Sequence, residues 1–158
     1  MLANLDFESS AAKHERLTRN LLAEIQRLTG LETTYLTRID WDGALQHITH
    51  ARNTGTLDIP EGLAVDWSDT VCRRALERGV TYTHDVPATF PDSQAALELG
   101  LQTYLSVPLV DNCGDVQGTL CAASSKRIQL GPEAISVMER FAQIISQGVA
   151  NRSAGARR

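Results

Sequence analysis

Two short turn signals, each set between apolar runs, constrain the fold of this chain more than any other feature. Asp42-Gly43 separates the runs 33–40 and 45–51, and the turn 112–115, which contains Gly114, separates 102–110 from 116–124. Turns of this composition favour β-hairpins, because glycine adopts the left-handed backbone that tight hairpin loops need. A hairpin imposes antiparallel pairing, so the two hairpins exclude a doubly wound parallel sheet.

Helical patterns and one further strand occupy the segments around these hairpins. The first helix is expected to begin at Ser9 or Ser10 and to stop at Gly30, with its apolar side formed by Leu17, Leu21, Leu22, Ile25 and Leu28. A helix over 67–78, capped by Asp66 or Ser68, is expected to stop at Gly79. A short third strand at 80–83 and a helix at 93–99 follow, and 53–65 is expected to be a loop.

The last helix is expected to open at Pro132, which is favoured in a first helical turn. Its apolar residues step by three and four along the chain: Ile135, Met138, Ala142, Ile145 and Val149. This spacing is typical of a coiled-coil seam in a dimer, but a helix that covers a sheet needs the same apolar stripe. The sequence leaves both interpretations open.

Length and charge limit the class of protein. The 158 residues suit one domain, which we expect over 1–152, with a flexible tail or the start of a linker at 153–158. A net charge of -4 argues against binding to nucleic acid. The chain has no apolar run near the ~20 residues that a membrane span needs, and its polar N-terminus is unlike a signal peptide. We therefore expect a cytoplasmic protein that binds neither nucleic acid nor membrane.

Four segments taken in order resemble a GAF domain, the ligand-binding relative of PAS domains in bacterial signalling proteins. They read WSDTVC at 67–72, YTHDVP at 82–87, LGLQTYLSVPL at 99–109 and QGTLCA at 117–122. The resemblance extends from Leu17 to Gly148. It implies an α+β fold with a central antiparallel sheet in the order 2-1-5-4-3, counted over five expected strands. The terminal helices would cover one face of the sheet, and short helices and loops would cover a ligand pocket on the other.

The resemblance also implies which residues line that pocket: Trp67, Thr70, Val71, His84, Phe90, Tyr104 and Cys121. A pocket needs apolar walls and a few polar groups, and this set supplies both. Each residue taken singly is more often a core residue than a ligand contact. His84 could ligate a haem iron, but a histidine before Asp85 and Pro87 more often bonds to its own turn.

The three cysteines are an odd number and lack metal-ligand spacing, so we expect neither a disulfide framework nor a metal site. Cys72 precedes Arg73 and Arg74, a setting that lowers a thiol pKa. Cys121 lies in an apolar strand, where inert thiols are common. Cys72 and Cys121 are the candidate redox pair, whereas Cys113 is expected to be exposed in a turn.

Two GAF chemistries look absent. Cyclic-nucleotide receptors of the family carry an Asn-Lys-x-Phe-Asp-Glu type of signature after the last hairpin, where this chain reads SSKRIQ at 124–129. Relatives that attach a bilin commonly do so at a cysteine beside a histidine, and none of the three cysteines has that neighbour.

The sequence therefore predicts a non-catalytic sensory domain that binds an unidentified small molecule. It would form a homodimer through its terminal helices and signal to an output domain such as a diguanylate cyclase or histidine kinase. One alternative is a thiol-dependent reductase of the free methionine sulfoxide type, and another is a dimerisation module without a ligand. The sequence identifies no cofactor.

Overall fold

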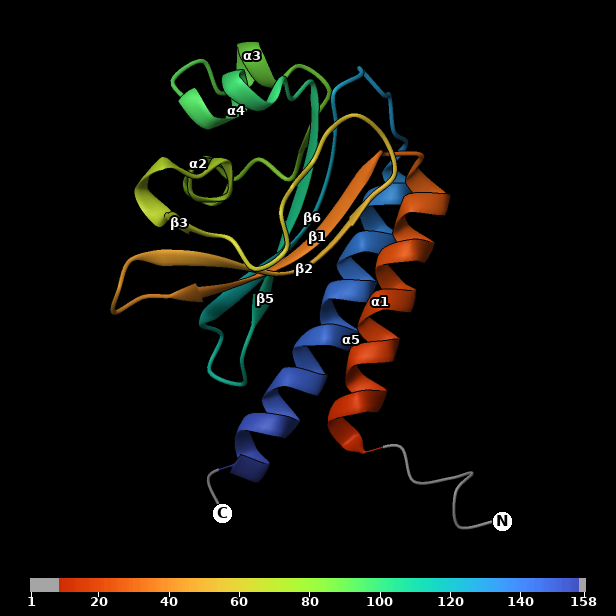
Figure 1. Ribbon diagram of the computed structural model, residues 1–158, viewed down its shortest axis with the longest axis vertical. Coiled ribbons are helices and arrows are strands. Elements are labelled where there is room, and N and C mark those ends of the chain that lie inside the picture. Colours follow the sequence, from red (N-terminus) through yellow and green to blue (C-terminus); the bar gives the residue numbers. More distant parts are fainter. Residues whose placement is uncertain (1–8, 157–158) are drawn as a thin grey trace.

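A computed structural model of the chain describes the backbone of residues 9–156 and the side chains of residues 9–147. Within this range the strands form a six-stranded antiparallel sheet in the order β3-β2-β1-β6-β5-β4 (Figure 1). The strands are β1 (Thr33–Asp40), β2 (Leu45–Asn53), β3 (Ala64–Asp66), β4 (Tyr82–Thr83), β5 (Thr103–Val110) and β6 (Val116–Ser124).

The antiparallel pairing predicted from the two hairpins and the α+β class implied by the resemblance are both confirmed. The five expected strands stand in the expected order, and the observed sheet adds β3 at the edge beside β2. The prediction of a continuous loop over 53–65 was wrong in this detail. β3 has only three residues, of which Val65 alone is partly covered, so it carries no alternation that a sequence pattern could reveal.

Two long helices, α1 (Ser10–Thr29) and α5 (Pro132–Ala156), lie side by side on one face of the sheet (Figure 1). Ser9 caps α1 by accepting a hydrogen bond from the Ala12 amide, and Gly30 ends it, as predicted. The apolar stripe of α5 faces the sheet, where Met138, Ala142 and Ile145 are buried in one core. These residues therefore pack on the sheet, and Val149 lies outside the described side chains.

Three short helices cover the other face: α2 (Val71–Arg78), α3 (Val86–Thr89) and α4 (Gln94–Leu99) (Figure 1). The single helix expected over 67–78 is broken at Thr70. A 3-10 turn, η2 (Trp67–Asp69), is capped by Asp66, and the Thr70 hydroxyl then caps α2 by accepting from the Arg73 amide at 3.1 Å. Threonine is a good cap and a poor interior residue, which accounts for the break.

Helix α3 is not among the elements that the sequence predicts, because proline disfavours the interior of a helix. Proline is tolerated in the first turn of a helix, where its missing N–H has no partner in any case. Pro87 occupies such a position, and Asp85 caps the helix by accepting from the Ala88 amide at 3.3 Å. No helix in the described part of the chain is both long and apolar enough to cross a membrane.

Candidate functional site

A cavity of about 360 Å³ lies between the sheet and the layer of short helices. Its walls come from β1, β2, the segment 59–66, residues 69–72 at the start of α2, helix α4, and Leu101. Apolar side chains dominate the lining, which comprises Tyr35, Gln46, Ile48, Ile59, Pro60, Leu63, Val65, Asp66, Asp69, Thr70, Val71, Cys72, Ala95, Leu99 and Leu101. Such a lining suits a small, largely apolar molecule held by a few polar groups.

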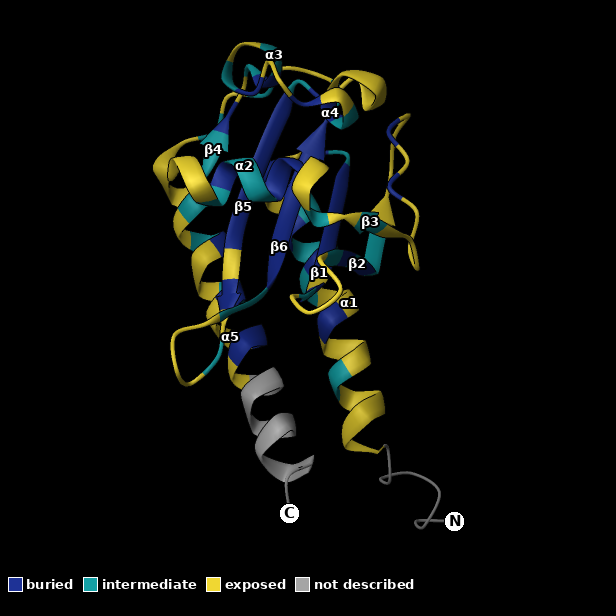
Figure 2. Ribbon diagram, turned by 90° about the vertical axis from the view of Figure 1, so that its left-hand side faces the viewer, coloured by how far each residue is buried: buried dark blue, intermediate teal, exposed yellow. Residues whose placement is uncertain are grey.

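The strands beneath the cavity carry a buried polar network. The Gln46 amide donates to the Thr37 hydroxyl at 2.9 Å and lies 3.3 Å from the Thr119 hydroxyl. The two threonine hydroxyls are 2.6 Å apart, across the β1–β6 pair. Figure 2 shows that the central strands β1, β6 and β5 are buried over most of their length. Buried polar groups that are fully paired fix one arrangement of a core, so this network holds the floor of the cavity in place.

Two cysteines and a tyrosine extend the network toward α2. The Cys72 sulfur lies 2.7 Å from the Tyr104 hydroxyl and 3.6 Å from the Cys121 sulfur. Cys121 in turn lies 3.5 Å from the Ser106 hydroxyl and 3.2 Å from the Thr119 hydroxyl. Both cysteines are free and buried. Only Cys72 reaches the cavity wall, so it is the sulfur that a bound molecule would meet.

The two thiols have opposite pKa shifts. The hydrogen bond with Cys121 lowers the pKa of Cys72, burial opposes this effect, and hydrogen bonds with Tyr104 and its neighbours lower the pKa further. Burial, followed by the hydrogen bond with Cys72, raises the pKa of Cys121 well above the ordinary value. The arginines that the sequence suggested as the cause bind elsewhere: Arg73 pairs with Glu77 and Arg74 with Asp92.

A cluster of ion pairs holds the short helices together. Arg74 and Arg78 of α2 both bind the Asp92 carboxylate, each with a nitrogen–oxygen distance of 3.0 Å. Their hydrogen bonds, that of Arg74 first, lower the pKa of Asp92 to about 2. The Arg78 guanidinium also stands over the Phe90 ring, 5.6 Å from its centroid. The cluster joins α2 to the segment between α3 and α4.

The seven predicted pocket residues lie in three different environments: the cavity lining, the buried core beneath it, and positions away from the cavity. Thr70 and Val71 line the cavity. Tyr104 and Cys121 lie in the buried network under it, and Phe90 is fully buried against the Tyr104 ring. The other two residues lie away from the cavity lining: Trp67 packs edge-on against Trp41, and His84 is exposed and stacked on Tyr82.

Sequence reasoning missed the contributions of β1, β2 and the segment 59–66. Tyr35 and Gln46 lie on strands that the sequence identified, and the alternation of Gln46 with Ile48 along β2 was a signal that both face one side. Nothing comparable marks Ile59 or Leu63, which lie between β2 and β3, or Val65, which lies in the three-residue strand β3.

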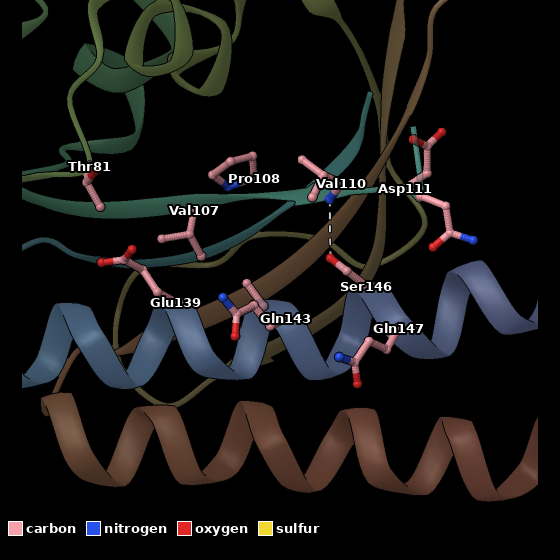
Figure 3. Close-up of a pocket in the computed structure, with 11 residues that line it drawn as sticks. Thr81, Val107, Pro108, Val110, Asp111, Glu139, Gln143, Ser146 and Gln147 are labelled. Atoms are coloured by element: carbon pink, nitrogen blue, oxygen red, sulfur yellow. Dashed lines mark hydrogen bonds between the residues drawn. The ribbon is translucent and has the colours of Figure 1, made fainter. Parts of the chain in front are cut away.

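A second hollow, of about 400 Å³, lies between α5 and the outer edge of β5 (Figure 3). Beyond the two residues that pair with β4, this edge has no strand beside it among the described residues. Pro108 has no N–H to offer there, and the Val110 amide donates to the Ser146 hydroxyl at 3.2 Å (Figure 3). Proline and side-chain capping are common ways to protect a sheet edge. We interpret this hollow as a sealed edge.

Metal binding has no support in the part of the chain that the structure describes, because no three histidine, cysteine or acidic side chains are grouped there to hold an ion. His50 is engaged with Glu15 of α1 at 2.6 Å.

Comparisons with known proteins agree with the observed fold. A family model described as GAF domain matches residues 11–150. Diguanylate cyclase DgcP from Escherichia coli (strain K12) is 41% identical over 133 residues, which are 84% of this chain and 39% of that protein. The chain thus spans about two fifths of that relative.

Solved structures show the same fold at low sequence identity. The blue-light absorbing form of the Thermosynechococcus elongatus PixJ GAF domain superposes with a TM-score of 0.73 at 14% identity, covering 96% of this chain and 94% of that chain. The GAF domain of an Acinetobacter phosphoenolpyruvate-protein phosphotransferase gives 0.69 at 11% identity, covering 94% and 97%.

Proposed function

We propose that this chain, which belongs to the GAF domain family, is a non-catalytic sensory module that binds a small molecule between its sheet and its short helices. The observation that carries the proposal is the cavity, whose floor is a paired polar network and whose outer layer is fastened by Asp92. Preformed, mainly apolar cavities with a few convergent polar groups are the usual form of a small-molecule site.

The lining suggests the chemistry of the ligand. Ile48, Leu63 and Leu101 offer apolar surface, and the lining adds polar groups from Tyr35, Gln46, Thr70 and Cys72. Asp66 and Asp69 are exposed and stand at the boundary, where negative charge disfavours an anionic ligand. We infer a small apolar molecule, neutral or cationic, rather than a phosphorylated one.

Signalling would pass through the sheet to α1 and α5. In β1, Tyr35 belongs to the core on the cavity side and its neighbour Leu36 to the core under the long helices. In β6, Cys121 and Leu120 divide in the same way. A ligand that favours one position of the strands therefore favours one packing of α1 and α5. The similarity to a diguanylate cyclase suggests such an enzyme as the output domain.

A cavity-filling variant tests the binding proposal. Ala95 lines the cavity from α4, whereas Ala88 is exposed on α3 and serves as the matched control. In native mass spectrometry of freshly purified protein, we expect an added mass that denaturation removes in the wild type and in Ala88→Trp, but not in Ala95→Trp.

If the wild type has its bare mass, indole serves as a probe in isothermal titration calorimetry. Indole should bind the wild type and Ala88→Trp and should not bind Ala95→Trp. The proposal is wrong if neither a copurified mass nor indole binding depends on Ala95.

We also propose a homodimer through the long helices, carried by apolar side chains that α1 leaves exposed. Leu17 and Leu28 are 48% and 47% exposed. They are eleven residues apart, so they lie within about 20° of each other around the helix. Leu28→Asp should convert a dimer to a monomer in light scattering after size exclusion, whereas Leu97→Asp, at an exposed leucine of α4, should not. A monomeric wild type would contradict the proposal.

A further inference from the structure

Cys72 and Cys121 are in contact where the layer of short helices α2, α3 and α4 packs on the sheet. Cys72 belongs to α2 and Cys121 to β6, and their sulfurs are 3.6 Å apart. A disulfide has a sulfur–sulfur distance near 2.05 Å, so the two atoms need to approach by about 1.6 Å. Helix α2 is short, borders the cavity and lies outside the sheet. A small shift of α2 can therefore bring the two sulfurs into bonding distance.

The surroundings of the two sulfurs differ in a way that assigns them different roles. Cys72 lies in the first turn of α2, two residues after its cap Thr70, where the positive end of the helix dipole favours a thiolate. The Tyr104 hydroxyl at 2.7 Å stabilises the same charge. Cys72 also lines the cavity, which gives small molecules a route to it, whereas Cys121 is fully buried behind it.

We propose that Cys72 and Cys121 form a peroxide-responsive thiol pair, in which Cys72 is the attacking sulfur and Cys121 the resolving one. This goes beyond ligand binding and does not depend on it. The oxidant is a hydroperoxide small enough to enter the cavity, such as hydrogen peroxide.

The reaction has two steps. The Cys72 thiolate attacks the terminal oxygen of the hydroperoxide, the O–O bond breaks, and Cys72 becomes a sulfenic acid while the leaving alkoxide or hydroxide takes up a proton. Cys121 then loses its proton as its sulfur attacks the Cys72 sulfur, and the S–O bond breaks to release water. The two thiols lose two electrons in total, the peroxide gains them, and a small dithiol can reverse the change by exchange.

The disulfide would change the site as well as the sulfur chemistry. It would join α2 covalently to β6 and remove the Cys72 thiol from its contact with Tyr104. Because Cys72 forms part of the cavity wall, oxidation alters the shape that a ligand meets. The pair would therefore couple the redox state to the proposed sensory pocket.

The test uses the full chain with Cys113→Ser, which removes the exposed thiol and with it intermolecular exchange. After hydrogen peroxide treatment and alkylation of the remaining thiols, we expect one peptide pair joined through Cys72 and Cys121 in non-reducing mass spectrometry, with most of the protein converted. With Cys121→Ser added, dimedone should label Cys72. With Cys72→Ser added instead, Cys121 should stay unlabelled.

Two results would overturn the proposal. One is that Cys72 and Cys121 both remain alkylatable in urea after peroxide treatment of the Cys113→Ser chain. The other is that dimedone labels Cys121 and not Cys72. The peptide map of the Cys113→Ser chain decides the first point even if the double variants do not fold. Because neither readout involves a ligand, failure here leaves the binding proposal to its own experiment.

Discussion

Replacing Glu32 by glutamine should destabilise the protein strongly at neutral pH and weakly in acid. Glu32 precedes β1, and its carboxylate collects hydrogen bonds from two distant segments. One oxygen accepts from the Ser124 hydroxyl at 3.1 Å and from the Ser125 amide and hydroxyl, and the other accepts from the Leu57 amide at 3.1 Å. The side chain thus joins the end of β6 to the segment that leads into the cavity wall.

The magnitude follows from the pKa of this carboxyl group. Partial burial raises the pKa of Glu32, but the hydrogen bonds from Ser125, Leu57 and Ser124 outweigh it and lower the pKa to about 2. An unfolded glutamate has a pKa near 4.3, and each unit is worth about 1.4 kcal/mol. The difference amounts to about 3 kcal/mol, which we reduce to about 2 kcal/mol because Glu32 is partly solvated.

The pH range follows from the direction of the shift. Because folding lowers the pKa of Glu32, the ionised carboxylate stabilises the fold fully when the pH is above the pKa of the unfolded chain. This stabilisation is lost as the pH falls from about 5 toward 2. In urea unfolding at pH 7, the free energy of unfolding of Glu32→Gln should therefore be about 2 kcal/mol lower than that of the wild type. The difference between the two proteins should become smaller toward pH 3. Glu77→Gln, in an exposed pair with Arg73, should change stability by no more than about 0.5 kcal/mol. A gap that stays constant with pH would refute the reasoning.

Three further changes test the sheet, the outer layer and the thiols. Gly118→Ala should lower the free energy of unfolding by about 2 kcal/mol or more, measured in urea, because the new Cβ would stand 2.0 Å from the Thr37 carbonyl oxygen. Asp92→Asn should speed amide hydrogen exchange in α2 and the segment between α3 and α4, but not in α1, because the anchor of two α2 arginines is weakened. Alkylation of Cys72 by iodoacetamide in the Cys113→Ser chain should reach half its maximal rate below pH 8.5, the midpoint of an ordinary thiol.

Features of the fold with a local cause could be predicted from the sequence. The hairpins, the Ser9 cap, the stop at Gly30 and the start of α5 at Pro132 each depend on residues within a few positions of one another. The break at Thr70 also has a local cause, but Asp66 and Ser68 are equally suitable caps in the same segment. The sequence pattern does not show which of the three residues caps α2. β3 depends on pairing with β2, which no short window contains.

The site was harder to predict because its contacts are remote in sequence. Cys72 and Cys121 were identified as a pair worth attention, yet only the fold places their sulfurs together. The expected cause of the Cys72 pKa shift was its two arginine neighbours, but helical geometry turns both toward other partners. Sequence proximity is therefore a poor guide to the electrostatic surroundings of a helical residue.

The pleat of the sheet sets how a change in the cavity can reach the long helices. Tyr104 and Cys121 belong to the cavity-side core, and their neighbours Leu105 and Leu120 belong to the core under α1 and α5. A strand displaced on one face must therefore move side chains on the other, because successive residues share one backbone. Gly118 of β6 lies close against the Thr37 carbonyl of β1, so neither strand can move past the other at this point. The two strands must therefore move together. Ligand binding or disulfide formation should consequently shift β1 against α1 and β6 against α5 as a unit. Gly118→Ala should therefore weaken the response of both helices, measured by amide hydrogen exchange before and after peroxide treatment, as well as the stability of the sheet.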